Sequence, residues 1–315
     1  MPFTIGLSPC FLNIDIAYLM KILQSCCLQF LFLPIFLSLV LNPVFIQSVF
    51  ASEKTAVSLL VNRLGAEKDI DPQVVKRYLI ETSLVVDPAI VAKNLKQVEK
   101  QASYDYFLNE KPLSLAHKFL ENNASWLEKM ECRFSVSKEL VAAIFLVESH
   151  FGNNGGRYPL LKVFTSLSLC DQEPLLRQTY DLLKQSYPEI DYQWLAKRAA
   201  RKSSWAYGQL KALLNMRQKV DIAQLKGSWA GAFGIPQFIP SSFLSYAVDG
   251  NDDGIIDLYL YQDAAASVMN YLSRHGWKGK MSKAKEEKAI WSYNHSRLYV
   301  RTILAIRDQL QMKNS

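Results

Sequence analysis

Glu148, near the end of the stretch from Ser137 to Gly152, is the side chain best placed to do chemistry. This stretch, SKELVAAIFLVESHFG, has the pattern of a short helix that Ser137 caps and Gly152 ends. Its apolar stripe consists of Leu140, Val141 and Ile144. Glu148 falls on the same stripe, where burial would raise its pKa and keep it protonated near neutral pH. A protonated carboxyl suits general acid–base catalysis, although a helix-end Glu taken alone more often turns outward or pairs with Arg.

The segment from Asp249 to Asp263, DGNDDGIIDLYLYQD, has the spacing of a calcium-binding loop. Positions one, three, five, six and nine of such a loop are taken by Asp249, Asn251, Asp253, Gly254 and Asp257. Leu260 replaces the bidentate Glu of position twelve, so Asp263 would have to close the shell, and Ile255 can add its carbonyl. The alternative is a turn rich in Asp, Asn and Gly that binds no metal.

Two further segments contain polar side chains in unusual settings. Three glycines fall within eight residues of Gly227–Ser242, GSWAGAFGIPQFIPSS, so this backbone must bend sharply or let another group approach closely. Gln237 there is either a satisfied core amide or a group that faces a ligand. Near the C-terminus, Tyr293, Asn294, Ser296 and Tyr299 cluster, and capping and packing would also account for them.

Other chemistries lack their motifs. No Lys-Ser/Thr follows the glycines as a phosphate loop requires. The four histidines share no metal-ligand spacing, and no Ser or Cys nucleophile motif stands out.

These segments are expected to lie on helices, because alternating strand patterns are scarce and the mature chain reads as mainly α. We expect helices over residues 113–130, 161–169 and 264–275, a new helix at Pro240, and one continuous helix over residues 289–310. The stretch 173–226 is helical and basic, with Lys197, Arg198, Arg201 and Lys202 clustered. That cluster is either a solvated face or a site for an anionic wall polymer.

The first 51 residues are expected to be an export signal. Lys21 precedes an apolar run from Cys26 to Val40, and Val49-Phe50-Ala51 resembles a signal-peptidase site. We therefore expect cleavage between Ala51 and Ser52, with the true start at Met20. An uncleaved membrane anchor ranks second, because Asn42 and Pro43 interrupt the run.

The mature chain would keep the net charge of +7, since Lys21 and Asp15 cancel. A basic exported protein suits an anionic wall polymer or a membrane surface, and export disfavours nucleic acid. Cys132 and Cys170 would remain, either bonded to each other or as two free buried thiols.

The chain resembles the lytic murein transglycosylases of the membrane-bound lytic transglycosylase B type, the soluble 35-kilodalton form included. The resemblance rests on four segments that occur in the same order: the Glu-bearing helix, GSWAGAFGIPQFIPSS, AVDGNDDGIIDL and YNHS. The resemblance covers about residues 105–310. It implies a lysozyme-like α domain with an accessory helical domain, here an N-terminal helical region over residues 52–130 and a core with the EF-hand-like calcium loop over 131–315. It also implies non-hydrolytic cleavage of the β-1,4 bond between N-acetylmuramic acid and N-acetylglucosamine, which leaves a 1,6-anhydromuramoyl end.

The resemblance assigns roles to single residues. The family's one catalytic Glu, in V-E-[ST]-x-[WF]-G, falls on Glu148 as acid and then base. The substrate-binding set is Ser228, Gln237, Tyr293, Asn294 and Tyr299. The calcium ligands are Asp249, Asn251, Asp253, Ile255 and Asp263, and calcium would be structural, with no cofactor for the chemistry. Peptidoglycan glycan strands are the expected partner, proteins of the cell-wall machinery are further candidates, and we expect a periplasmic or cell-envelope monomer.

Two departures from the family pattern stand out. Only Lys278 to Lys288 separates Gly276-Trp277 from AIWSYNHS, where the family usually has a small β-containing insertion, and Ile235-Pro236 replaces a more flexible pair. The lipoprotein cysteine of the membrane-bound form is also absent. A hydrolytic muramidase of the same fold and a non-catalytic peptidoglycan-binding scaffold remain as alternatives.

Overall fold

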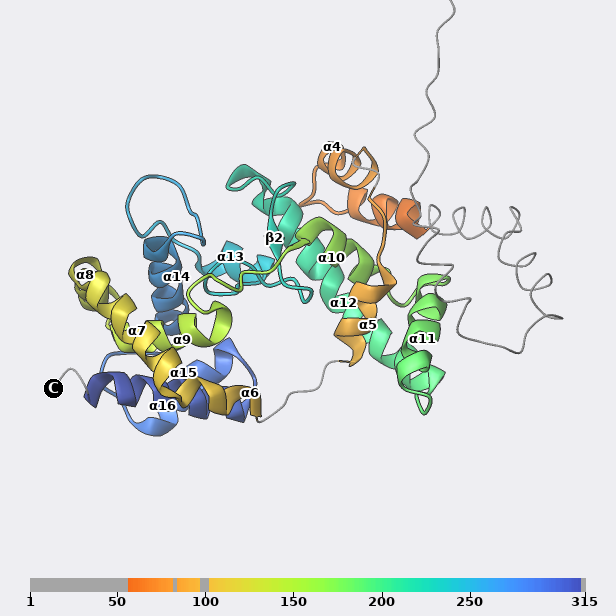
Figure 1. The fold of residues 1–315 in the computed structure, drawn as a ribbon. Helices are drawn as coiled ribbons and strands as arrows, with labels where there is room; N and C mark the ends of the chain where they lie inside the picture. Colours follow the sequence, from red (N-terminus) through yellow and green to blue (C-terminus); the bar gives the residue numbers. More distant parts are fainter. Residues whose placement is uncertain (1–55, 82–83, 97–101, 313–315) are drawn as a thin grey trace, which may run out of the picture. The chain divides into compact units, whose positions relative to one another are not determined.

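The computed structural model describes residues 56–81, 84–96 and 102–312. The chain divides into two units, residues 1–51 and 52–315, and every described residue belongs to the second (Figure 1). The expected export signal and its cleavage site lie outside the described residues. In the described part of the chain, no helix is long and apolar enough to cross a membrane.

The elements before the Glu148 helix are short. Residues 56–65 are helical, and they are followed by α4 (Pro72–Val75), η1 (Lys76–Ile80), α5 (Pro88–Lys96), α6 (Ala102–Asp105) and η2 (Tyr106–Leu108). The single helix expected over residues 113–130 is wrong. The structure has α7 (Glu110–Asn122) and α8 (Ala124–Phe134), because Asn123 leaves the helical conformation at φ −123° and ψ 12°.

The central elements follow the expected order. They are α9 (Lys138–Ser149), the strand β1 (Tyr158–Pro159), α10 (Leu160–Ser168), α11 (Leu175–Ser186), α12 (Tyr192–Asn215), η3 (Met216–Gln218) and β2 (Lys226–Gly227). The two short strands pair antiparallel, with Tyr158 opposite Gly227. This pairing brings the chain after Glu148 against the start of the glycine-rich segment.

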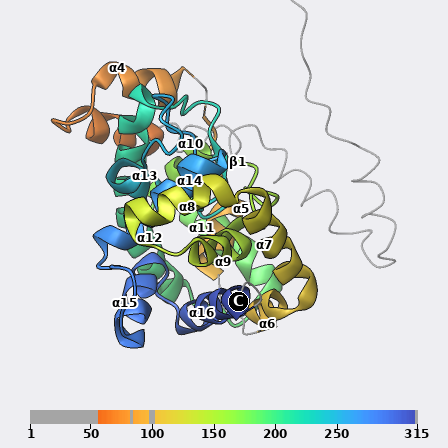
Figure 2. The ribbon, with the colours of Figure 1, turned by 90° about the vertical axis from the view of Figure 1, so that its left-hand side faces the viewer.

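The last helices are α13 (Pro240–Tyr246), α14 (Tyr261–Arg274), α15 (Lys283–Tyr293) and α16 (Arg297–Met312). The continuous helix expected over residues 289–310 is wrong, since the chain turns between Tyr293 and Arg297. Asn294 adopts an extended conformation there, and the Ser296 amide donates to the Asn294 carbonyl (2.8 Å). The break gives α15 and α16 different directions (Figure 2).

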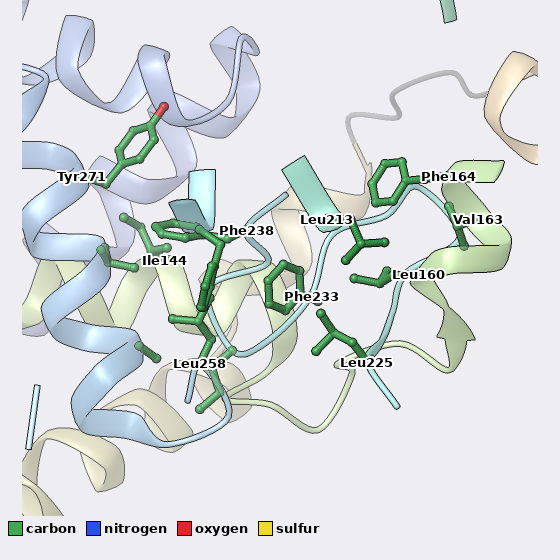
Figure 3. Close-up of a cluster of buried hydrophobic side chains, with 14 of the residues drawn as sticks. Ile144, Leu160, Val163, Phe164, Leu213, Leu225, Phe233, Phe238, Leu258 and Tyr271 are labelled. Carbon is green, nitrogen blue, oxygen red and sulfur yellow. The ribbon is translucent and has the colours of Figure 1, made fainter. Parts of the chain in front are cut away.

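Helices gather around α9 and around α12. The helix α9 packs against α7, α8, α14 and α16, whereas α12 packs against α5, α10, α11 and α13. Figure 3 shows the buried side chains that link the groups: Phe233 lies between Ile144, Phe238 and Leu258 on one side and Leu160 and Leu225 on the other. The boundary expected between residues 130 and 131 stays a prediction.

The two remaining cysteines are free, so the disulfide considered above is not formed. The alternative of two buried thiols is also wrong for Cys132, which is exposed on α8. Cys170 is buried, and its thiol donates to the Ala199 carbonyl (3.3 Å).

Candidate active site

Glu148 lies in the last turn of α9. Ser137 caps the first turn as expected, its Oγ accepting from the Leu140 amide (3.3 Å), and Leu140, Val141 and Ile144 are fully buried. The helix ends at Ser149, three residues before Gly152. His150, Phe151 and Gly152 all adopt left-handed φ angles (48°, 58° and 89°), and this turns the chain away from the helix axis.

Glu148 as a whole is partly exposed, but its carboxyl is buried, and this burial raises its pKa from 4.5 to about 7. The rise has a simple physical cause, because removing water penalises the charged form of the acid. The Tyr299 hydroxyl acts in the opposite direction and lowers this pKa by interacting with the carboxylate. Glu148 can therefore both release and regain a proton near neutral pH.

Tyr299 reaches Glu148 from α16, which packs along α9. Only 1% of Tyr299 is exposed, and within the described residues its hydroxyl makes no hydrogen bond of 3.5 Å or less. Its interaction with Glu148 therefore does not have the geometry of an ordinary hydrogen bond. Burial and the nearby Glu148 raise the pKa of Tyr299 well above its usual value, so this hydroxyl stays protonated.

Tyr293 stands beside Tyr299 at the end of α15. The two rings are parallel within 7°, with centroids 6.3 Å apart. The Tyr293 hydroxyl donates to the Pro236 carbonyl (2.5 Å), and burial together with Glu148 raises the pKa of Tyr293 well above its usual value. The break between α15 and α16 thus brings both tyrosines to Glu148.

Ser149 joins the end of α9 to the glycine-rich loop, which is the segment Gly227–Pro240. The Ser149 side chain is fully buried, and its Oγ donates to the Ile235 carbonyl (2.7 Å) and accepts from the Gly152 amide (2.9 Å). The sequence motifs gave this residue no role. The available signal was a small polar side chain directly after Glu148, at the end of the apolar part of the helix.

The glycines of this loop allow close approach, as expected. A Cβ on Gly231 would lie 2.2 Å from Cζ of Phe164, and one on Gly234 would lie 2.5 Å from Cβ of Leu258. Both glycines also have left-handed φ angles, 91° and 72°. The loop is therefore fitted tightly onto α10 and onto the chain before α14.

Ser228 and Gln237 hold the shape of this loop. The Ser228 Oγ accepts from the Ala230 amide (3.3 Å) and the Ala232 amide (3.1 Å), and the Gln237 Nε2 donates to the Gly234 carbonyl (2.8 Å). Both side chains are half-buried, as is Asn294 at the end of α15. The structure brings Tyr293 and Tyr299 to Glu148, while substrate contacts of Ser228, Gln237 and Asn294 stay predictions.

The acidic loop before α14 is folded around Asp263. This side chain is fully buried, and its two carboxylate oxygens accept from the Gly250 amide (2.8 Å) and the Asp257 amide (2.7 Å). Burial, with a smaller contribution from Asp249, raises the pKa of Asp263. Asp263 thus closes the loop onto the helix that follows it.

The other expected ligands are also engaged within the loop. Asp249 Oδ2 accepts from the Gly254 amide (2.6 Å), Asn251 Nδ2 donates to Asp253 Oδ2 (2.9 Å), and the Ile255 amide donates to Asp253 Oδ1 (2.8 Å). No three His, Cys, Asp or Glu side chains among residues 56–81, 84–96 and 102–312 are grouped as metal ligands. The donor set consists of hard oxygens that fit calcium, and the buried Asp263 is a carboxylate whose charged form a cation would stabilise.

Replacing Tyr299 with Phe is expected to raise the pKa of Glu148 further. The substitution removes the hydroxyl that favours the ionised carboxylate. A pH titration of the Glu148 carboxyl by ¹³C NMR measures the change. Tyr293→Phe is the matched control, because its hydroxyl is bound to Pro236, and an equal rise in both variants would contradict the assignment to Tyr299.

Comparison with known proteins relates the chain to lytic transglycosylases. The family model described as "Transglycosylase SLT domain" matches residues 52–288. Membrane-bound lytic murein transglycosylase B of Escherichia coli (strain K12) is 33% identical over 146 residues, which cover 46% of this chain and 33% of that protein. The matched region thus spans about a third of that relative's length.

Two solved structures share the fold. The structure of SltB3 from Pseudomonas aeruginosa in complex with NAG-anhNAM-pentapeptide has a TM-score of 0.66 and 20% identity, covering 82% of this chain and 80% of that chain. The Escherichia coli lytic transglycosylase Slt35 in complex with calcium has a TM-score of 0.64 and 20% identity, covering 82% and 93%. These likenesses confirm the expected mainly α, lysozyme-like fold.

Proposed function

Because the chain belongs to the transglycosylase SLT domain family, we propose that it is a peptidoglycan lytic transglycosylase. Its reaction cleaves the β-1,4 bond between N-acetylmuramic acid and N-acetylglucosamine and leaves a 1,6-anhydromuramoyl end. The observation that carries the proposal is the buried Glu148 carboxyl, with a pKa of about 7, at the end of α9 beside Tyr299. Such a group can serve in turn as acid and as base at neutral pH.

In the proposed mechanism, protonated Glu148 first donates its proton to the oxygen that leaves the muramoyl unit. The resulting carboxylate then takes the proton of the muramoyl 6-hydroxyl while that oxygen attacks the anomeric carbon. Most glycosidases use two carboxylates for these steps; here the substrate's own hydroxyl replaces the water, and its N-acetyl group stabilises the intermediate. One carboxyl is therefore sufficient, and atoms balance without water.

The two tyrosines support this alternation of roles. Tyr299 remains protonated, so it can donate toward the carboxylate that forms after the first step and limit the rise in the pKa of Glu148. Tyr293 fixes the Pro236 carbonyl, and with it the loop beside the acid. Ser228, Gln237 and Asn294 are proposed to bind the sugar units, and SltB3, which shares the fold, has been crystallised with a muropeptide.

We further propose that the chain is exported and that cleavage after Ala51 releases it into the periplasm. The match to the family model begins at residue 52, next to the cleavage site expected from the sequence. The alternative is that the N-terminal segment is not cleaved and anchors the protein in the membrane.

Calcium is expected to stabilise this fold and to take no part in the chemistry. Binding to the acidic loop at about 100 times its Kd would add ~2.7 kcal/mol of stability, which raises the Tm of a chain of this size by roughly 5–10 °C. Thermal unfolding with excess calcium and with a chelator measures this difference. The double variant Asp249→Ala/Asp253→Ala is the control; equal Tm values for the wild type, or an equal calcium response in this variant, would contradict a site in the loop.

Mass spectrometry of purified sacculi digested with residues 52–315 tests the proposed reaction. We expect muropeptides with anhydro ends, which are lighter than reducing-end products by one water. Reducing-end products would instead establish a hydrolytic muramidase. Absence of products together with retained sacculus binding would establish a scaffold.

A further inference from the structure

The basic cluster noted in the sequence lies on α12, a helix that contains no Asp or Glu. At 1.5 Å per residue its 24 residues extend about 36 Å. One side is buried, with Leu195, Ala199, Ala206 and Leu210 at 0% exposure. The flank beside this stripe, which we term the α12 outer face, consists of Trp194, Lys197, Arg198, Arg201, Lys202 and Trp205, of which Arg198 and Lys202 are half-buried.

Each tryptophan of the α12 outer face is exposed beside a cation. Trp194 is 48% exposed, with the Arg198 guanidinium 5.6 Å from its ring centroid, and Trp205 is 36% exposed, with Lys202 Nζ at 4.2 Å. Trp205 also packs on Phe164, at 6.0 Å between centroids. The two indoles are thus held at the surface and are only partly covered.

The four cations of this face have no acidic partner among the described residues. Lys211, on the same helix, differs from them because it pairs with Glu67 (2.7 Å) and Asp69 (3.2 Å). Four like charges within six residues repel one another, and this repulsion lowers the stability of the helix. A negatively charged partner would remove that repulsion.

The spacing suits an extended partner. Trp194 and Trp205 are eleven residues apart, or about 16 Å along the helix axis, with the four cations between them. Aromatic rings offer flat apolar surfaces, and cations pair with carboxylates. A glycan strand that carries acidic stem peptides presents sugar faces and carboxylates together over such a distance.

A membrane surface fits less well. Interfacial helices bury a continuous apolar face in the lipid, but the apolar side of α12 is buried within the protein. Only the two tryptophans could enter a bilayer.

We therefore propose that the α12 outer face is a second binding surface for peptidoglycan strands, separate from the Glu148 site. This inference rests on the proposed function. Holding the polymer at two places raises the local concentration of strands near Glu148, and such linkage can multiply apparent affinity by about 10²–10⁴-fold. The surface would therefore favour intact sacculi over short soluble fragments, which cannot reach both places.

The test measures binding to purified sacculi by co-sedimentation, with every protein in a Glu148→Gln background so that no glycan is cut. Replacing Lys197, Arg198, Arg201 and Lys202 with Gln is expected to weaken binding by about tenfold or more. Trp194→Ala, which changes an exposed side chain, is expected to weaken it in the same direction. The matched control replaces four exposed lysines that have no aromatic partner among the described residues, namely Lys118, Lys129, Lys283 and Lys285, with Gln.

Unchanged binding of the α12 variants would overturn the proposal, and so would an equal loss in the control, which would indicate a general charge effect. A loss of binding to anionic lipid vesicles without a loss on sacculi would assign the face to a membrane instead. Because binding is read without turnover, this result is independent of the products that wild-type protein releases. Failure of the proposed reaction can therefore be told apart from failure of this surface.

Discussion

Replacing Glu148 with Gln is expected to lower turnover of sacculi by about 10²–10⁴-fold, the range that general acid–base catalysis contributes. Gln matches the shape of a protonated Glu but can neither donate nor accept the transferred proton. Quantitative mass spectrometry of released muropeptides measures the loss. Binding to sacculi should persist, because Gln keeps the hydrogen-bonding capacity of the side chain.

The same substitution is expected to stabilise the fold above pH 7. In the wild type the folded protein retains the Glu148 proton up to a pKa of about 7, whereas the unfolded chain releases it near 4.5. Wild-type stability therefore falls as pH rises from 4.5 to 7 and then levels off. Glu148→Gln lacks this loss and should gain about 2 kcal/mol at pH 8, less than the roughly 3.4 kcal/mol that the difference between pKa 4.5 and 7 corresponds to, because the residue is partly exposed.

Glu139→Gln is the control for both effects. Glu139 is a buried carboxylate on the same helix, within 4.0 Å of Lys138 and away from the tyrosines. This variant should keep its activity. Undiminished turnover in Glu148→Gln, or equal losses in both variants, would remove Glu148 from the role of acid and base.

Gly156→Ala is expected to destabilise the protein by at least about 3 kcal/mol, within the range of severe single substitutions. Gly156 has a φ of 87°, and an added Cβ would lie 2.1 Å from the Gly227 carbonyl carbon and 2.3 Å from the Ser228 amide nitrogen. These are backbone atoms, so a side-chain rotation cannot relieve the overlap. Separation of β1 from β2 would displace the glycine-rich loop, and we expect activity to fall together with stability.

Gly155→Ala provides a matched control one residue away. The nearest atom to an added Cβ at Gly155 is the Gly152 carbonyl oxygen at 3.6 Å, an ordinary contact. Chemical denaturation should show Gly155→Ala within about 1 kcal/mol of the wild type. Equal stabilities of the two variants would mean that close packing of β1 on β2 does not hold the site.

Local signals in the sequence were sufficient for the helix that carries Glu148 and for the burial of this side chain. The features predicted correctly depend only on spacing within one helix. They are the cap at Ser137, the buried stripe from Leu140 to Ile144 and the position of Glu148 in the last turn. The pKa of Glu148 also follows from its place on the stripe.

Long-range contacts were not accessible in the same way. The breaks at Asn123 and Asn294 interrupt segments whose helical periodicity continues, because tertiary packing outweighs local propensity there. The hydroxyl of Ser149 and that of Tyr299 acquire their roles from partners on other elements. The resemblance to the family supplied Tyr299, whereas the signal for Ser149 was weaker, a small polar side chain directly after Glu148.

The hydrogen bonds from Ser149 to Ile235 and from Tyr293 to Pro236 have a consequence for when the enzyme becomes active. They join residues 86 and 57 positions apart in the chain, so each of them requires the chain to close a long loop first. Before they form, Glu148 is solvated and ionises near pH 4.5, so at neutral pH it has no proton to give. On the proposed mechanism, a partly unfolded chain would therefore leave the cell wall intact, and cutting would begin only when folding is complete.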